Sequence, residues 1–324
     1  MVLSLKKFYE GFMKKQTNQS DITIKKSIMD KIWRYFFLTV TLICSSVIIF
    51  IVLFILIKGL TPFIKSYHIN GAFYKVDFIK FIFGSRWFKN PNIYGIGFII
   101  VNTIYVTIIS LLMAIPISIL TALFIAKIAP KKISTILSYI IELLSSIPSV
   151  IYGMFGMGVV TKIVKALSNF FGYQSAGGLS VLTVAIVLAI MIIPTITMIA
   201  VSSIQAVKKA YIEGSLALGA SITQTNFKIV LSSAKNGIFS GVILGIGRAL
   251  GEATAVSMVA GNPSSGPNFH PFEATKTLTS TMLQGLTEAE GLEYDIRFSV
   301  GIVLIMLILG SNLLLNLIKR RIKI

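Results

Sequence analysis

Six apolar segments in this 324-residue chain are each long enough to cross the ~30 Å hydrocarbon core of a bilayer as a helix. Pro116 lies inside the second of them and predicts either a kink or a helix that continues past the membrane interface. We expect transmembrane helices near Phe36–Ile57, Ile96–Ala126, Ile136–Val160, Leu179–Val201, Gly237–Ala260 and Phe298–Ile318.

Composition agrees with a membrane-embedded chain. Hydrophobic residues make up 55% of the sequence and charged residues only 13%, whereas soluble domains carry about 25% charged residues. The net charge of +18 is also typical of nucleic-acid-binding proteins. The basic residues are concentrated in the loops between apolar segments, which is the pattern of topology signals beside anionic lipid. The sequence therefore predicts an all-α membrane protein with six transmembrane helices and no nucleic-acid partner.

Residue types that hold metals or disulfides are scarce. Cys44, the single cysteine, lies in an apolar segment and excludes an internal disulfide. The two histidines, His68 and His270, are far apart in the sequence and fall in expected loops. We therefore expect no metal, no cofactor and no histidine-based catalytic centre.

The distribution of Lys and Arg predicts the orientation in the membrane. With a cytoplasmic N-terminus, the inner segments hold nineteen basic residues and the outer loops hold ten. This bias favours a multi-pass protein of the cell membrane with both termini in the cytoplasm. The outer loop 58–97 is itself basic, which weakens the contrast.

The expected organisation has four parts, and the sequence predicts no fold for the first of them. They are a basic cytoplasmic tail (1–33), a first helix with its external loop (34–95), a transmembrane core (96–318) that contains a large inner loop (205–236), and a cytoplasmic tail (319–324).

The inner loop carries signals for two short helices. The stretch KKAYIEGSLAL has helical character, and Gly219 follows it where a helix ends in a left-handed cap. The next residues, Ser221–Gln224, have the S-x-x-Q form of a capping box that starts a second helix. One interpretation is an amphipathic hairpin that merely connects two spans on the cytoplasmic face.

The same loop resembles the EAA motif of type I ABC importer permeases, which reads Glu-Ala-Ala, three residues, Gly, nine residues, then Ile-x-Leu-Pro. Here the two alanines are replaced by small residues and the proline by Ser232, while the spacing is kept. The resemblance implies a MetI-like fold and a coupling helix that docks on a cytoplasmic ATPase. The matching positions are Glu213, Gly214, Ser215, Gly219, Ile229 and Leu231.

Two further segments are similar to phosphate ABC permeases of the PstC type: IPSVIYGMFG at 147–156 and GRALGEATAVSMVAGNP at 247–263. The family's usual Gly-Thr at the start of the second span is Asn102-Thr103 here, which is a departure. The resemblance implies phosphate as substrate. The implied partners are a second permease of the PstA type, cytoplasmic ATP-binding subunits and an extracytoplasmic phosphate-binding protein. No G-x-x-x-x-G-K-[ST] motif occurs, so we expect no ATP hydrolysis by this chain.

Arg248 and Glu252 place two charges inside the fifth apolar segment, where each costs roughly 2.5–3.5 kcal/mol near the bilayer centre. On a continuous helix they share a face with Gly237, Gly241 and Gly245, a strip that permits close helix packing. That face is expected to point into the protein. One interpretation is a purely structural i,i+4 pair. The other interpretation, which we favour, is an anion pathway, because the planar guanidinium of arginine matches phosphate oxygens. In addition, an apolar pair would pack two helices at a lower desolvation cost than a charged pair, so packing alone does not explain the charges.

The third apolar segment adds two candidates for the pathway, Glu142 and Ser149. Glu142 lies nearer the inner end of the segment, so a second interpretation is that its carboxylate only reaches the membrane interface. For Ser149, the alternative to a pathway role is a hydrogen bond from its hydroxyl to the backbone of its own helix. Pro148 and Gly153 predict a kink or break in this helix.

Several other functions remain open. An ion channel or receptor with no ATPase is disfavoured by the EAA spacing, and a membrane enzyme is disfavoured because acid–base and metal clusters are lacking. Among transporters, the alternatives are the PstA role or another oxyanion such as sulfate or molybdate.

Overall fold

The computed structural model describes residues 2–69, 71–89 and 92–321 of the chain. The chain divides into two compact units, residues 1–55 and residues 56–324. The first unit is a single helical segment, the larger part of α1 (Val2–Ile64). The basic tail, for which the sequence predicts no fold, is part of this helix from Val2 onward. Met1 lies outside the described residues.

The second unit begins with the last turns of α1 and contains every other element. The short elements of the loop after α1 come first: β1 (Tyr67–Ile69), β2 (Ala72–Tyr74), α2 (Phe78–Phe83), β3 (Trp87–Phe88) and β4 (Ile93–Tyr94). The strands form two antiparallel hairpins, β1–β2 and β3–β4. The remaining elements are α3 (Gly97–Leu123), η1 (Phe124–Ile128), α4 (Lys131–Ser146), α5 (Ser149–Phe155), η2 (Gly156–Val160), α6 (Thr161–Phe170), α7 (Val181–Gln205), α8 (Lys209–Ala217), α9 (Ile222–Gln224), η3 (Thr225–Val230), α10 (Leu231–Gly251), α11 (Thr254–Val259), α12 (Leu278–Leu283), η4 (Leu286–Glu288) and α13 (Gly291–Arg321).

The described residues contain six helices that are long and apolar enough to cross a membrane, as the sequence predicts. Four of them overlap the expected spans closely, and the second continues past Pro116 through a π-helical turn to Ile128. The six are Met29–Ile64, Gly97–Ile128, Ser149–Phe170, Val181–Gln205, Ile222–Gly251 and Gly291–Lys319.

The expected third span, Ile136–Val160, is wrong as a single helix. α4 ends at Ser146, Ile147 and Pro148 are extended, and a new helix starts at Ser149. Proline explains the break, because it disfavours helical backbone at the residue before it and donates no N–H. The predicted break at Pro148 is therefore confirmed, and the membrane-spanning helix runs from Ser149 to Phe170 instead.

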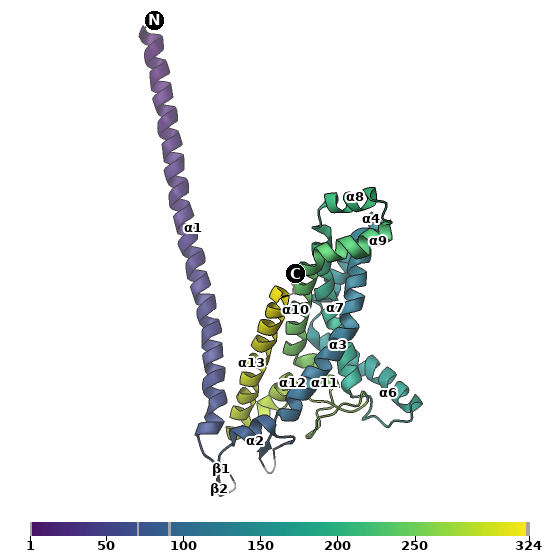
Figure 1. Cartoon of the computed structure of the whole chain (residues 1–324). Coiled ribbons are helices and arrows are strands. Elements are labelled where there is room, and N and C mark those ends of the chain that lie inside the picture. The colour runs from purple at the N-terminus through teal and green to yellow at the C-terminus, as the bar shows by residue number, and fades with distance from the viewer. Residues whose placement is uncertain (1, 70, 90–91, 322–324) are drawn as a thin grey trace. The chain divides into compact units, whose positions relative to one another are not determined.

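α7 forms the centre of the second unit and packs against α3 and α10 (Figure 1). The glycine strip of α10 makes this contact possible. A side chain added at Gly241 would lie 3.2 Å from the Cβ atom of Ile199, and one at Gly245 would lie 2.9 Å from Ile196. The prediction that this strip faces another helix is confirmed.

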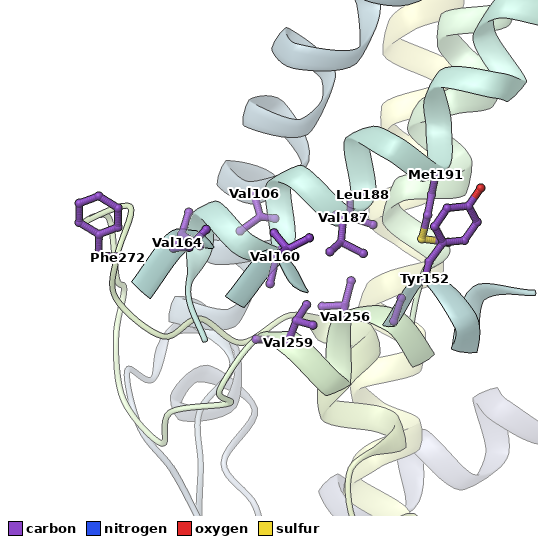
Figure 2. Packing of buried hydrophobic residues seen from close by; sticks show 14 residues of the cluster. Val106, Tyr152, Val160, Val164, Val187, Leu188, Met191, Val256, Val259 and Phe272 are labelled. Atoms are coloured by element: carbon purple, nitrogen blue, oxygen red, sulfur yellow. The ribbon is translucent and has the colours of Figure 1, made fainter. Parts of the chain in front are cut away.

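A buried hydrophobic cluster ties the shorter helices to α7 and α3. Figure 2 shows its side chains converging from α3, α5, α6, α7 and α11. Val187 and Val259 would both clash with a side chain at Gly156, so the small residue at the start of η2 lets these helices approach. The cluster includes Val106, Tyr152, Val160, Val164, Val187, Leu188, Met191, Val256, Val259 and Phe272.

Lys276 is a buried cation in the loop between α11 and α12. Only 5% of its surface is exposed, and its Nζ atom lies 5.7 Å from the centre of the Trp87 ring. It makes no ion pair with the described residues. Burial, with a smaller contribution from the nearby Arg297, lowers the pKa of Lys276 to about 8.

This lowered pKa predicts how stability changes with pH. Between about pH 8 and 10.5 the unfolded chain keeps the proton that the folded chain releases, so the free energy of unfolding rises with pH in this window. Lys276→Met is expected to raise the unfolding temperature at pH 7 and to remove this rise. Thermal unfolding followed by tryptophan fluorescence at pH 7 to 10 is the measurement. The same pH slope in both proteins would contradict the assignment.

Candidate functional site

A helix break separates the two charged residues of the fifth apolar segment. α10 ends at Gly251, Glu252 has extended backbone angles (φ −74°, ψ 114°), and α11 begins at Thr254. The Glu252 carboxylate accepts a hydrogen bond from the Ala255 backbone N–H at 3.0 Å. The expected continuous helix over Gly237–Ala260 is therefore wrong, because a glycine and a carboxylate that bonds the next turn's backbone both favour an end.

Arg248 lies on α10 one turn before the break and is half-buried. Its Nη1 atom donates a 2.7 Å hydrogen bond to Oγ1 of Thr195, which follows Pro194 in α7. Among the described residues it has no carboxylate within ion-pair distance, Glu252 included. The expected i,i+4 pair is not formed, because the break takes Glu252 off the helical face of Arg248. A positive charge in a membrane span is thus left with a hydroxyl partner.

Two further helices hold the break in place. The backbone carbonyl of Glu252 accepts a 2.7 Å hydrogen bond from the Thr279 hydroxyl of α12. α5 packs against α11 on another side, where a side chain at Gly153 would lie 3.0 Å from the Cα atom of Ala255. The break is therefore a meeting point of α10, α11, α12 and α5.

Ser149 is the first residue of α5 and is half-buried. Its hydroxyl makes no hydrogen bond with the described residues, so the alternative role of bonding to its own helix is not seen. Tyr152, three residues later, is buried, and its hydroxyl donates a 2.7 Å hydrogen bond to the carbonyl of Leu144. The fold thus places α5, which begins with Ser149, against α11 beside the helix break.

Glu142 occupies a different place. It lies on α4, is exposed, and lines a cavity of about 150 Å³ with α7 residues that include Thr197. The Thr197 hydroxyl is buried and has no hydrogen-bond partner among the described residues. Among the described residues no hydrogen bond or ion pair joins Glu142 to Arg248 or Glu252, so the four pathway candidates are not linked into one network.

A second cavity, of about 320 Å³, adjoins the helix break. Gly251, Ala253 and Thr279 line it together with Arg297 and apolar side chains. The guanidinium of Arg297 is already engaged, with Thr281 O at 2.7 Å and Glu293 at 3.0 Å. This cavity therefore does not offer a free cation to an anion.

The loop 205–236 forms the two expected short helices with the expected caps. Gly219 has φ +83°, and the N–H groups of Gly219 and Ala220 bond back to Leu216 and Ser215, which is a Schellman ending for α8. Ser221 and Gln224 form both bonds of a capping box. The predicted helix–turn–helix is confirmed in detail.

The turn presents apolar side chains to its surroundings. Leu218 is 90% exposed and Ile222 is 71% exposed, at the end of α8 and the start of α9. Glu213 and Gly214 are also exposed on α8. Figure 1 shows α8 and α9 at the opposite end of the second unit from α2. An exposed apolar pair on a rigid turn is a typical docking feature.

The other motif residues hold the loop together. The Ser215 hydroxyl lies 2.9 Å from that of Thr225, which joins α8 to η3. Ile229 is half-buried, and Leu231 packs against a buried cluster at the base of α7. The motif therefore combines an exposed part around Glu213 with a part that fixes the loop to the transmembrane core.

Sequence reasoning missed Thr195, Thr279 and Leu218. The first two are distant in sequence from the charges they contact, so no local pattern identifies them. The one available signal for Thr195 was a hydroxyl directly after a proline within an apolar span.

Comparison with known proteins gives a family match over most of the transmembrane core. Residues 114–324 match the model of the binding-protein-dependent transport system inner membrane component family. The chain is 36% identical over 289 residues to the probable ABC transporter permease protein YqgH of Bacillus subtilis, covering 87% of this chain and 88% of the relative. It is 31% identical over 242 residues to the phosphate transport system permease protein PstC of Pasteurella multocida, covering 70% and 75%.

Solved structures support the same fold. A bacterial alginate ABC transporter chain, in complex with an alginate-pentasaccharide-bound periplasmic protein, matches with a TM-score of 0.64 at 19% identity, covering 92% of this chain and 97% of that one. A chain of the inward-facing MetNI methionine ABC transporter matches with a TM-score of 0.54 at 16% identity, covering 68% and 92%. The expected MetI-like fold is confirmed. The chain belongs to the binding-protein-dependent transport system inner membrane components, the permease subunits of ABC transporters.

Proposed function

We propose that this permease forms half of the pathway of an ATP-driven phosphate importer, in the PstC role, and couples to a separate ATPase. The observation that carries the proposal is Arg248, a half-buried cation in a membrane span whose described partner is the Thr195 hydroxyl rather than a carboxylate. The names of the PstC relatives support phosphate as the anion. A half-buried cation in a membrane span without a counter-ion favours binding an anion from the pathway.

The chemistry of Arg248 suits phosphate. Its guanidinium presents two parallel N–H donors that match two phosphate oxygens, and charge-assisted hydrogen bonds strengthen away from bulk water. The bond from Nη1 to Thr195 holds the side chain against α7. The remaining donors are then oriented before the anion arrives, which lowers the entropy cost of binding.

The Glu252 carboxylate favours the binding of phosphate over that of fully ionised oxyanions. Its Oε1 atom accepts from Ala255 N–H, while Oε2 makes no hydrogen bond with the described residues. Near neutral pH, phosphate keeps at least one proton and can donate it to a carboxylate, whereas sulfate and molybdate carry none and are repelled. The same negative charge limits how tightly the anion is held and so favours release.

Glu252→Gln separates a transport role from a structural one. We expect the folded protein to persist, because a glutamine oxygen still accepts from Ala255, while phosphate uptake falls about ten-fold with the loss of a charged acceptor. Membrane abundance and labelled phosphate uptake are measured together. Normal uptake would show that the carboxylate serves only as a cap for α11.

The helix break is also suited to conformational change during transport. Alternating access requires segments that shift against one another around a fixed binding residue. Glu252 has one hydrogen bond to α11 and one to α12, so movement of either helix changes the carboxylate's position relative to Arg248. In the proposed cycle, ATP binding closes the ATPases, the α8–α9 turn transmits this motion, and the pathway opens outward.

The proposed assembly contains two permeases, two ATPase subunits and an external phosphate-binding protein. The exposed Leu218 and Ile222 are proposed to enter an apolar groove of the ATPase. Co-purification of the tagged permease with its ATPase from membranes tests this assembly. Recovery of a stable permease with no ATPase would favour the rival interpretation of a channel or receptor.

We also propose that both termini and the α8–α9 turn are cytoplasmic, on the basis of the Lys and Arg bias. In a Cys44→Ser background, cysteine at the exposed position Ser265 is expected to react with a membrane-impermeant maleimide in intact cells. Cysteine at exposed Lys132 is expected to react only after the membrane is opened. The reverse labelling pattern would invert the orientation.

A further inference from the structure

The segment around α2 is fastened to the ends of two membrane spans. The Val76 N–H donates a 3.3 Å hydrogen bond to the carbonyl of Pro62, in the last turn of α1. The Gly97 N–H, at the first residue of α3, donates a 2.9 Å hydrogen bond to the carbonyl of Gly84. α2 is thus held between the ends of two helices long and apolar enough to span a membrane, and the ends of such helices lie at the membrane–water boundary.

α2 exposes large apolar side chains at this boundary. Its sequence is FIKFIF, and only Phe81 is buried in the unit's core. Phe78 is 59% exposed, Ile79 is 69% exposed and Phe83 is 78% exposed. Aromatic and aliphatic side chains in a short helix beside a span end are typical of segments that insert into the interfacial layer of a bilayer.

A basic cavity of about 670 Å³ lies beside these side chains. Lys75, Lys80 and Arg86 line it, and none of the three makes an ion pair with the described residues. Among the described lining residues, Asp77 is the one that is acidic. Its carboxylate accepts hydrogen bonds from the N–H groups of Lys80 and Ile79, which lower the pKa of Asp77 and commit it to capping α2. The cavity therefore keeps an excess of positive charge.

We propose that this cavity binds an anionic phospholipid, with the phosphodiester among Lys75, Lys80 and Arg86 and the acyl chains along the exposed face of α2. The combination of cations and apolar side chains distinguishes this ligand from free phosphate, which gains nothing from Phe78, Ile79 or Phe83. The attachment to two span ends favours a lipid over an acidic protein partner, because it places α2 against the bilayer. The inference does not depend on which anion is transported.

The test uses the purified transporter complex and a matched pair of double variants. Lys75→Gln/Lys80→Gln removes two cavity cations, and Lys162→Gln/Lys165→Gln removes two exposed cations from α6. Native mass spectrometry counts phosphatidylglycerol and phosphatidylcholine retained by each complex after identical detergent washing. Each basic residue near an anionic surface strengthens binding roughly five-fold, so the cavity variant, which lacks two, is expected to retain phosphatidylglycerol about 25-fold less tightly. The α6 variant should resemble the wild type.

Two added measurements keep the outcomes distinct. Inorganic phosphate at millimolar concentration should leave the retained lipid in place, and displacement would overturn the lipid assignment in favour of a small-anion site. Phe83→Ser should reduce retention of both lipids, since it removes apolar contact and no charge. Equal retention in the two double variants would overturn the proposal. The proposal would also be overturned if the cavity variant retained lipid normally but no longer bound the extracytoplasmic binding protein. That result would make the cavity a protein-docking surface.

Discussion

Arg248→Gln is expected to lower phosphate uptake by roughly ten- to a hundred-fold while the protein stays folded. The wild-type guanidinium supplies charge-assisted hydrogen bonds, each worth about 1.5–3 kcal/mol, and glutamine supplies neither the charge nor the fork. Arg248 is half-buried and its partner Thr195 is a neutral hydroxyl, so the shorter glutamine loses this hydrogen bond without leaving a charge unpaired. Arg248→Lys retains the charge without the fork and is expected to have intermediate uptake.

Arg297 provides the matched control for this experiment. It is an arginine in a membrane span whose two Nη atoms are engaged by Thr281 and Glu293, and it is almost completely buried. Arg297→Gln is expected to reduce the amount of folded protein, because it leaves buried partners unpaired. Uptake per folded molecule should change little. Similar behaviour of the two glutamine variants would place Arg248 among the structural residues.

Gly219→Leu is expected to release the ATPase and abolish most transport while the spans remain inserted. Gly219 has φ +83°, a conformation that costs a side-chain-bearing residue roughly 1–2 kcal/mol. Nothing lies within 4 Å of the position where a Cβ atom would be placed. The effect therefore comes from the backbone turn that positions Leu218 and Ile222 and not from a clash. Pull-down of the ATPase from detergent extract, together with uptake, is the measurement.

Gly219→Asn is the control, because asparagine adopts the left-handed conformation more readily than other side-chain-bearing residues. It should retain the ATPase and transport close to wild-type levels. Undiminished pull-down and uptake in the leucine variant would show that the turn does not couple the permease to the ATPase.

The features predicted best from the sequence are those set by local chemistry. The Gly219 cap and the Ser221–Gln224 capping box each depend on residues within one turn of each other. The glycine strip of α10 was placed correctly against another helix, since its spacing depends only on helical geometry. The break at Pro148 follows from the constraint that proline puts on its neighbour.

The errors share one cause, which is the assumption that an apolar run is a continuous helix. Hydropathy does not reveal that the Glu252 carboxylate bonds the first turn of α11 or that α10 ends three residues after Arg248. The contact from Arg248 to Thr195 spans 53 residues, and that from Thr279 to Glu252 spans 27. Such partners are chosen by the packing of α7, α10 and α12, and nothing in the local sequence specifies them.

Uptake of labelled phosphate, sulfate and molybdate in a strain that lacks the chromosomal transporter tests the central claim most directly. The strain would carry the complete transporter with either wild-type permease or Arg248→Gln. The account predicts ATP-dependent uptake of phosphate by the wild type, little uptake of the other two anions, and loss of phosphate uptake in the variant at equal membrane abundance. Equal phosphate uptake with and without Arg248, or preferential uptake of sulfate or molybdate, would contradict it.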